Sequence, residues 1–341
     1  MAQNSKENTR SSDIKFIDIA KTIPSELLES ASSAKRIDSK TKLPSKIFRG
    51  FVQAIYMDVL IGNKKTALIE VTTNEGITVY VRLTDGGLRQ PKNPGLMVGK
   101  YYAVVITNLI DLSDSGDNEE RFCAIGSIQT AEYMIGYSLN ARMAANPKEF
   151  HDEKRIGTIN SIVNTDINGR RHEMVFFEYS GLQLMMMDYQ VGYYSQAHPL
   201  TSEYRLGDEV AFQIQNVELT RIDDAERGLR GSYFDIRASG KRFKENPKIT
   251  VNRLVATGAF INAYITKVDP VKGVLVEVAP GYELKATFSN QTAGSNVKKL
   301  DAVEHTPVQV QVLSVDHTRR FGVVRVLSFP QGFADTSQVL F

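Results

Sequence analysis

The residues best suited to chemistry in this sequence are basic residues near its C-terminal end, which suit the binding of phosphate groups. Residues 248–341 carry ten Lys and Arg against seven Asp and Glu, a net charge of +3, whereas residues 151–247 carry twelve against fifteen, a net charge of −3. Counterion release requires several cations in one groove. The alternative is an ordinary solvated rim. The candidate phosphate-binding residues are Lys298, Lys299, Arg319, Arg320 and Arg325.

Residue types that support catalysis or metal binding are not arranged in recognisable motifs. The single cysteine, Cys123, has no partner for a disulfide or a zinc site. No P-loop, dinucleotide fingerprint or nucleophile elbow occurs. We therefore expect a protein that is not an enzyme and that uses no cofactor and no metal ion. The five histidines are scattered without metal-ligand spacing: His151, His172, His198, His305 and His317.

The composition is that of an ordinary globular protein. The chain has 341 residues, 42% of them hydrophobic and 23% charged, and its 41 Lys and Arg against 39 Asp and Glu give a net charge of +2. This length predicts two to three domains. No apolar run is long enough to cross a membrane, and the polar start has no signal-peptide pattern. We expect a protein without membrane contact, in the cytoplasm.

The elements that would position the basic residues form a threefold repeat. Residues 257–288 alternate apolar and polar positions between Gly and Pro breaks, which predicts a three-stranded meander. A pattern of two apolar residues, Glu and another apolar residue recurs at 68–71, 176–179 and 275–278. The predicted divisions are an arm with a short helix at 1–45, units of five strands at 46–130, 155–241 and 255–328, a partly helical linker at 131–154, a second linker at 242–254, and a tail at 329–341.

This arrangement resembles the RNA-binding OB-fold repeat of the large bacterial small-subunit ribosomal protein, the ribosomal S-one repeat. The similarity covers residues 46–130, 155–241 and 255–327. The resemblance implies a mainly all-β fold with three tandem five-stranded OB-fold-like β-barrels, to which this chain adds a short helical N-terminal arm and a linker helix. It also implies binding of single-stranded RNA.

In that family, a phenylalanine on the second strand and a histidine on the third strand stack on bases. Phe176 stands at the phenylalanine position of the second repeat, and Leu68 and Leu275 stand there in the other two. At the histidine position the second and third repeats have Met186 and Thr287. The second repeat therefore has aromatic residues without positive charge, and the third has positive charge without aromatic residues.

Two functions follow as alternatives. The first is binding of single-stranded RNA or DNA through Phe176, the basic cluster and a strand tyrosine such as Tyr80, although strand tyrosines are commonly packing residues. The second is a structural or assembly role in a virion or other large complex. In that case the barrels are scaffolds in an oligomer or larger assembly, and residues 1–45 and 329–341 dock onto protein partners.

Overall fold

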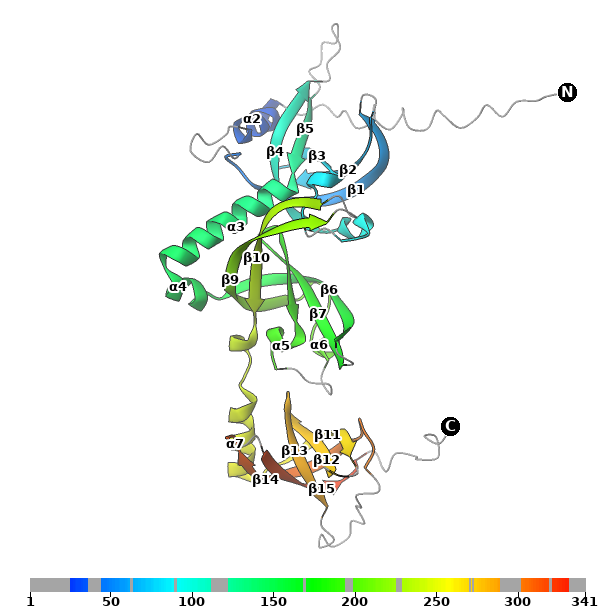
Figure 1. Ribbon diagram of the computed structural model, residues 1–341, viewed down its shortest axis with the longest axis vertical. Coiled ribbons are helices and arrows are strands. Elements are labelled where there is room, and N and C mark those ends of the chain that lie inside the picture. Colours follow the sequence, from blue (N-terminus) through cyan, green and yellow to red (C-terminus); the bar gives the residue numbers. More distant parts are fainter. Residues whose placement is uncertain are drawn as a thin grey trace, which may run out of the picture. The chain divides into compact units, whose positions relative to one another are not determined.

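A computed structural model describes residues 25–35, 44–61, 64–88, 91–111, 122–167, 170–193, 199–224, 229–269, 271, 273–288, 302–318 and 321–330. The chain is mainly β, with three five-stranded sheets in sequence order (Figure 1). The prediction of a mainly β chain with three units of five strands is confirmed. We call the sheets the N-terminal barrel, the middle sheet and the C-terminal barrel.

The N-terminal barrel is closed, with strand order β1-β2-β3-β5-β4. Its first strand pairs antiparallel with both β2 and β4, and β3 runs parallel to β5. The interior is apolar, because the inward positions of these strands are filled by fully buried β-branched residues such as Val52, Ile69 and Val79. The strands are β1 Phe48–Ile61, β2 Lys64–Thr73, β3 Thr78–Arg82, β4 Tyr101–Asp111 and β5 Phe122–Ser127.

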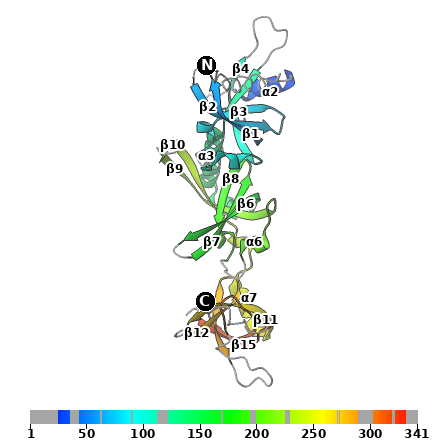
Figure 2. The same ribbon diagram turned by 90° about the vertical axis from the view of Figure 1, so that its right-hand side faces the viewer.

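The C-terminal barrel repeats this topology, with closed strand order β11-β12-β13-β15-β14 and β13 parallel to β15. Helix α7, Pro247–Thr257, packs beside it and buries Val251 in its core (Figure 2). Gly258 ends α7 in the left-handed conformation, at φ 60°. The strands are β11 Phe260–Asp269, β12 Gly273–Ala279, β13 Tyr282–Phe288, β14 Pro307–Asp316 and β15 Phe321–Ser328.

The middle sheet has five strands in the order β10-β9-β6-β7-β8 and is open, with β10 and β8 at its edges. A closed barrel was predicted at 155–241, but the sheet formed by these residues is open. Both edge regions have other packing partners: Phe234 of β10 packs on a helix, and Gly181, just before β8, accepts a hydrogen bond from the Ala103 amide of β4 at 2.8 Å. The strands are β6 Arg155–Ile167, β7 Arg170–Tyr179, β8 Leu182–Met187, β9 Glu209–Asp224 and β10 Leu229–Ser239.

The predicted linker helix is α3, Ile128–Ala145. Ser127 caps its N-terminus by accepting a hydrogen bond from the Thr130 amide at 3.0 Å. Gly136 lies so close to Phe234 that a Cβ there would be 2.5 Å from the Phe234 Cβ. The helix therefore needs glycine at this contact. The other short helices are η1 Leu83–Asp85, η2 Pro94–Met97, α4 Pro147–Asp152, α5 Asp188–Val191, α6 Leu200–Glu203 and η3 Lys241–Phe243.

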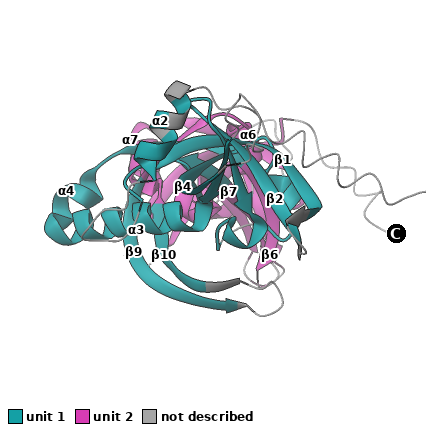
Figure 3. Ribbon diagram, turned by 90° about the horizontal axis from the view of Figure 1, so that it is seen from above, with its two compact units in different colours: residues 1–160, 176–185, 213–238 teal, residues 161–175, 186–212, 239–341 magenta. Residues whose placement is uncertain are grey.

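The chain divides into two compact units (Figure 3). Unit 1 comprises residues 1–160, 176–185 and 213–238, and unit 2 comprises residues 161–175, 186–212 and 239–341. Each unit contains one closed barrel and part of the middle sheet's residues.

The glutamate of the repeated pattern is buried in all three sheets. Glu70, Glu178 and Glu277 are between 5% and 8% exposed. Glu178 accepts a hydrogen bond from the Gly181 amide at 2.5 Å, and Glu277 accepts one from the Gly281 amide at 2.7 Å. A buried carboxylate needs such donors, and the turn amides need an acceptor. Glu178 and Glu277 thus stabilise the turns that follow their strands, whereas Glu70 accepts a hydrogen bond from the Tyr56 hydroxyl. In all three sheets the repeated glutamate is a structural residue.

The described parts of both termini pack on the chain itself. Helix α2, Ser25–Ala34, buries Ala31 and Ala34 in the core of the N-terminal barrel, and it lies in the arm for which a short helix was predicted. Phe329, the first residue of the predicted tail, is 9% exposed and packs in the C-terminal core. Residues 1–24, 36–43 and 331–341 lie outside the described residues. Docking of these segments on protein partners therefore stays a prediction.

Candidate nucleic-acid interface

The C-terminal barrel carries a row of two lysines with a leucine between them on its outer surface. Leu275 of β12 pairs with Lys267 of β11 on one side and with Lys285 of β13 on the other. Both lysines are exposed and Leu275 is half-buried. Their neighbours Val274, Val276 and Leu284 are at most 2% exposed and fill the interior. Alternation along the strands therefore places the row on the outside.

A register irregularity in β11 is what turns Lys267 outward. Ile265 and Thr266 are both buried, at 0% and 9% exposure, so two consecutive residues of this strand lack solvent contact. The register shifts between Ile265 and Lys267, as expected where one extra residue opposes the partner strand. After the shift, Lys267 faces solvent next to Leu275.

The fifth strand extends this surface. In β15, Phe321, Val323 and Arg325 alternate with the buried residues Gly322, Val324 and Val326. Val323 pairs with Lys285 and Arg325 pairs with Thr287, so the outward residues of β13 and β15 share one face. We call this surface the basic face. It comprises Lys267, Leu275, Lys285, Thr287, Phe321, Val323 and Arg325.

The basic face carries more positive than negative charge. Among the described residues, no hydrogen bond or ion pair engages the side chains of Lys267, Lys285 or Arg325. Glu277 on the same side is buried and is held by the Gly281 amide. Glu283 is exposed, two residues before Lys285 on β13. Asp316 is also exposed and pairs with Phe321 of this face. Three cations therefore accompany two exposed carboxylates, and an anionic ligand would meet a small net positive charge.

Two aromatic side chains adjoin one end of the basic face. The Tyr282 hydroxyl lies 2.6 Å from His317 Nδ1, and His317 Nε2 lies 2.7 Å from Asn252 Oδ1 of α7. Burial, with the Asp316 carboxylate as the smaller cause, raises the pKa of Tyr282. This chain of hydrogen bonds ties α7 to the hairpin between β14 and β15 and holds the start of β15 in place.

The structure places the predicted site residues on different surfaces or in the interior, and some of them lie outside the described residues. Arg325 is half-buried on the basic face, and Phe176 is half-buried on β7 of the middle sheet. Arg325 belongs to unit 2 and Phe176 to unit 1. Tyr80 is 3% exposed and therefore cannot stack on a base without rearrangement. The remaining predicted cations lie outside the described residues: Lys298, Lys299, Arg319 and Arg320.

Tyr80 is buried although it faces outward from its barrel. It belongs to a second apolar cluster with Val59 and Leu68, against which Tyr56 and Ile125 pack. Burial raises the pKa of Tyr80, and the Glu70 carboxylate raises it further. The N-terminal barrel therefore uses for its own packing the surface that corresponds to the basic face.

Lys267, Lys285 and Phe321 were not among the predicted site residues. The expectation that the third repeat lacks aromatic residues at its surface is wrong, because Phe321 is 54% exposed. The alternating pattern of residues 282–288 could have indicated Lys285 as an outward residue. Lys267 follows an irregularity that the pattern does not reveal, and Phe321 joins the others only through the parallel pairing of β13 and β15.

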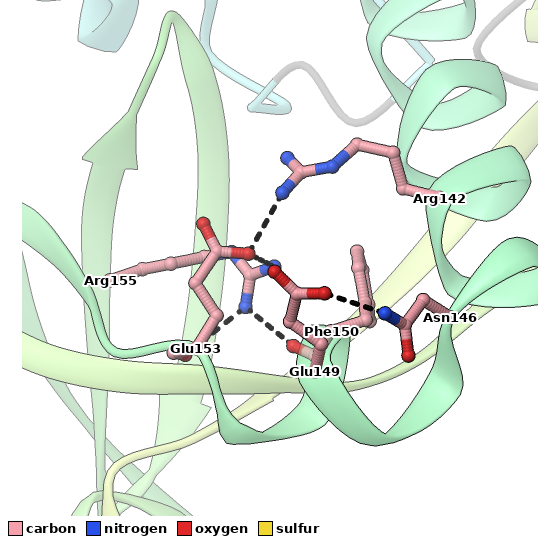
Figure 4. A network of polar contacts seen from close by, with 6 residues as sticks. All are labelled: Arg142, Asn146, Glu149, Phe150, Glu153 and Arg155. Atoms are coloured by element: carbon pink, nitrogen blue, oxygen red, sulfur yellow. Dashed lines mark hydrogen bonds and ion pairs between the residues drawn. The ribbon is translucent and has the colours of Figure 1, made fainter.

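A second polar site lies at the junction of α3, α4 and β6 (Figure 4). The buried Arg155 guanidinium donates to Glu153 at 2.6 Å and lies 4.6 Å from the Phe150 ring centre, while Arg142 donates to the same Glu153 oxygen at 3.0 Å. Arg142 and Glu153 also line an open pocket of about 780 Å³ of mixed charge. These contacts hold the two helices and the strand together, so we assign the network a structural role.

A third polar contact joins His172 of β7 to Asp188 of α5. His172 Nδ1 lies 3.1 Å from both Asp188 carboxylate oxygens, and Asp188 also accepts hydrogen bonds from the Glu173 and Tyr189 amides. In the described ranges no group of three His, Cys, Asp or Glu side chains is placed to hold a metal ion. No helix in these ranges has the length and apolar character required to cross a membrane.

Comparison with known proteins leaves the family open. No protein-family model matches the chain, and no curated protein matches it significantly in sequence.

Proposed function

We propose that this protein binds single-stranded nucleic acid, with RNA as the first ligand to test, through the basic face of the C-terminal barrel. The observation that carries the proposal is the row Lys267, Leu275 and Lys285, with Arg325 on the adjoining strand. Several unpaired cations on one surface are what counterion release requires. The protein acts without catalysis in this proposal.

We further propose that the two closed barrels are OB-folds of the ribosomal S-one type. The support is their strand order, with a first strand paired to both the second and the fourth and a third strand parallel to the fifth. The middle sheet has the corresponding order but opens between its third and fifth strands. OB-folds commonly bind single strands, but this is an analogy at the level of fold.

The test is binding of the full-length chain to a fluorescein-labelled oligouridylate at a series of salt concentrations. For a single strand, three phosphate contacts give a log–log salt slope of about −2. Replacement of Lys267, Lys285 and Arg325 by Gln should weaken binding and make the slope shallower by about 2. A control that replaces Lys148, Arg237 and Lys248 by Gln removes the same charge elsewhere. The proposal fails if the wild-type chain does not bind at low salt or if both triple variants behave alike.

An assembly role is the second candidate, because the N-terminal barrel has closed the corresponding surface. Leu68 and Tyr80 are 2% and 3% exposed there, and the Tyr56 hydroxyl donates to Glu70 at 2.5 Å. In this alternative, the protein is a component of a virion or other large complex. Light scattering of the full-length chain over a concentration series tests it. Growth of the molar mass with concentration supports assembly, and a constant monomer mass counts against it.

A further inference from the structure

Phe321 is an exposed aromatic residue on a rigid strand. It is 54% exposed, begins β15 and pairs with Asp316 of β14. The next residue, Gly322, has no room for a side chain, because a Cβ there would lie 2.6 Å from the Ser314 carbonyl oxygen and 2.7 Å from Leu284 Cδ2. Close packing on both sides thus fixes the backbone that presents the ring.

A single exposed phenylalanine does not by itself indicate a binding site, since single apolar residues are common on protein surfaces. Phe321 differs because of what lies beside it. Lys285 is paired with Val323, two residues along β15, and Arg325 follows two residues later. At a rise of about 3.3 Å per residue, the Phe321 and Arg325 backbones are about 13 Å apart, with Lys285 beside the midpoint. Phe321 and Arg325 are therefore spaced along β15, with Lys285 beside them on β13.

This spacing favours one class of ligand. A base that is free of its partner can lie flat on an aromatic ring, while the phosphates on its 3′ or 5′ side need cations at regular steps. A duplex keeps its bases stacked and offers Phe321 no free face. An acidic peptide would meet the cations but would leave the ring without a planar partner. The combination of ring and cations is thus complementary to a single strand.

We infer that Phe321 is a base-stacking residue and that a single strand lies along β15 over about three nucleotides, with phosphates near Lys285 and Arg325. This inference rests on the proposed function, because it assigns a register to the ligand on the basic face. It differs from the resemblance, which places stacking at Leu275 and Thr287. Neither of these residues is aromatic, whereas Phe321 on the fifth strand is.

The experiment compares variants of the full-length chain in binding labelled oligouridylates of three, six and twelve nucleotides at low salt. Phe321→Leu keeps apolar bulk but removes the aromatic face, so affinity should fall by about 5- to 150-fold, the equivalent of one lost base stack. Phe321→Tyr should retain binding. The salt slope should be the same in all three proteins, because no cation is changed. Circular dichroism verifies that each variant is folded.

The matched control is Phe260→Leu. Phe260 is 63% exposed and lies on β11 of the same barrel, where it pairs with Gln311 of β14 rather than with β13 or β15. The Phe260→Leu variant should bind the oligouridylates with the same affinity as the wild-type chain. A duplex of the same length should bind more weakly than the single strand.

The results separate this inference from the proposed function. If Phe321→Leu binds as tightly as the wild-type chain while the triple Gln variant loses affinity, stacking at Phe321 is refuted and phosphate binding survives. Equal affinity for duplex and single strand also refutes stacking. If polyglutamate competes and its binding also depends on Phe321, the ligand is an acidic peptide instead. If the wild-type chain binds no oligonucleotide, the proposed function and this inference both fail.

Discussion

Replacing Arg49 by Leu should destabilise unit 1 without affecting the C-terminal barrel. The Arg49 guanidinium donates to both oxygens of Glu178, at 3.0 and 2.9 Å, and lies 3.9 Å from the Tyr101 ring centre. Glu178 is 7% exposed as a side chain, whereas Arg49 is 40% exposed. The hydrogen bond to Glu178 is the largest cause that raises the pKa of Arg49. The pair thus joins the N-terminal barrel to the part of the middle sheet within unit 1.

The magnitude follows from what remains after the substitution. Removing one partner of a fully buried ion pair costs about 3–5 kcal/mol, because a buried charge is left uncompensated. Glu178 keeps the Gly181 amide as a donor, and solvent reaches the Arg49 side, so we expect a loss of about 2–3 kcal/mol in the free energy of opening. An exposed pair provides the control. Arg237→Leu breaks a contact to Asp235 at 3.3 Å and should cost about 0.5 kcal/mol or less.

Hydrogen exchange measured by peptide is the suitable assay, because the two units need not unfold together. Amides of β1, β4 and β8 should exchange about 30- to 150-fold faster in Arg49→Leu, and amides of β12 and β15 should not change. Unchanged protection in β4 and β8 would refute the assignment of this pair as a stabilising contact. Equal acceleration in the C-terminal barrel would refute the independence of its stability.

Three further predictions concern other residues of unit 1. Gly136→Ala should destabilise the protein by about 1–3 kcal/mol in urea unfolding, because the clash with Phe234 outweighs the roughly 1 kcal/mol gain in helix propensity. The control Ser138→Ala, on the exposed side of the helix, should be neutral or stabilising. A Gly136→Ala variant that is more stable than the wild-type chain would contradict the close packing on Phe234. Burial raises the pKa of Cys123 to about 11, so alkylation of this single cysteine, followed by mass, should be slow at pH 8 and accelerate toward pH 11; a midpoint near pH 8.5 would show an accessible thiol. The hydrogen bond to Glu70 raises the pKa of Tyr56 to about 12, so the contribution of this bond to stability is complete below pH 10 and is lost between pH 10 and 12. In urea unfolding at a series of pH values, the alkaline loss of stability should be smaller in Tyr56→Phe than in the wild-type chain. Identical curves of stability against pH would argue against the bond.

The strands could be predicted because alternation and glycine turns are local signals. The repeated glutamate also located the second strand of each unit, although its role at the turns of Gly181 and Gly281 appears only in the structure. The open middle sheet could not be predicted in the same way. Its edges depend on contacts far apart in sequence, such as Gly136 with Phe234 and Ala103 with Gly181.

The candidate site shows the same limit more sharply. Arg325 was predicted from charge alone, and it lies on the basic face. Lys267 required knowledge of the β11 irregularity, and Phe321 required the parallel pairing of strands that are separated by about forty residues in sequence. Tyr80 was named as a possible stacking residue, but it packs in a second apolar layer with Val59 and Leu68. Outward direction and solvent exposure are thus different properties, and sequence alternation indicates only the first.

The most direct test of the central claim is photo-crosslinking of the full-length chain to a single-stranded RNA, followed by mass spectrometric identification of the linked peptides. The proposal predicts crosslinks in peptides that contain residues 282–288 or 321–326, and their loss when Lys267, Lys285 and Arg325 are replaced by Gln. Crosslinks confined to the N-terminal barrel or the middle sheet, or none at low salt, would contradict the assignment of the basic face as the nucleic-acid interface.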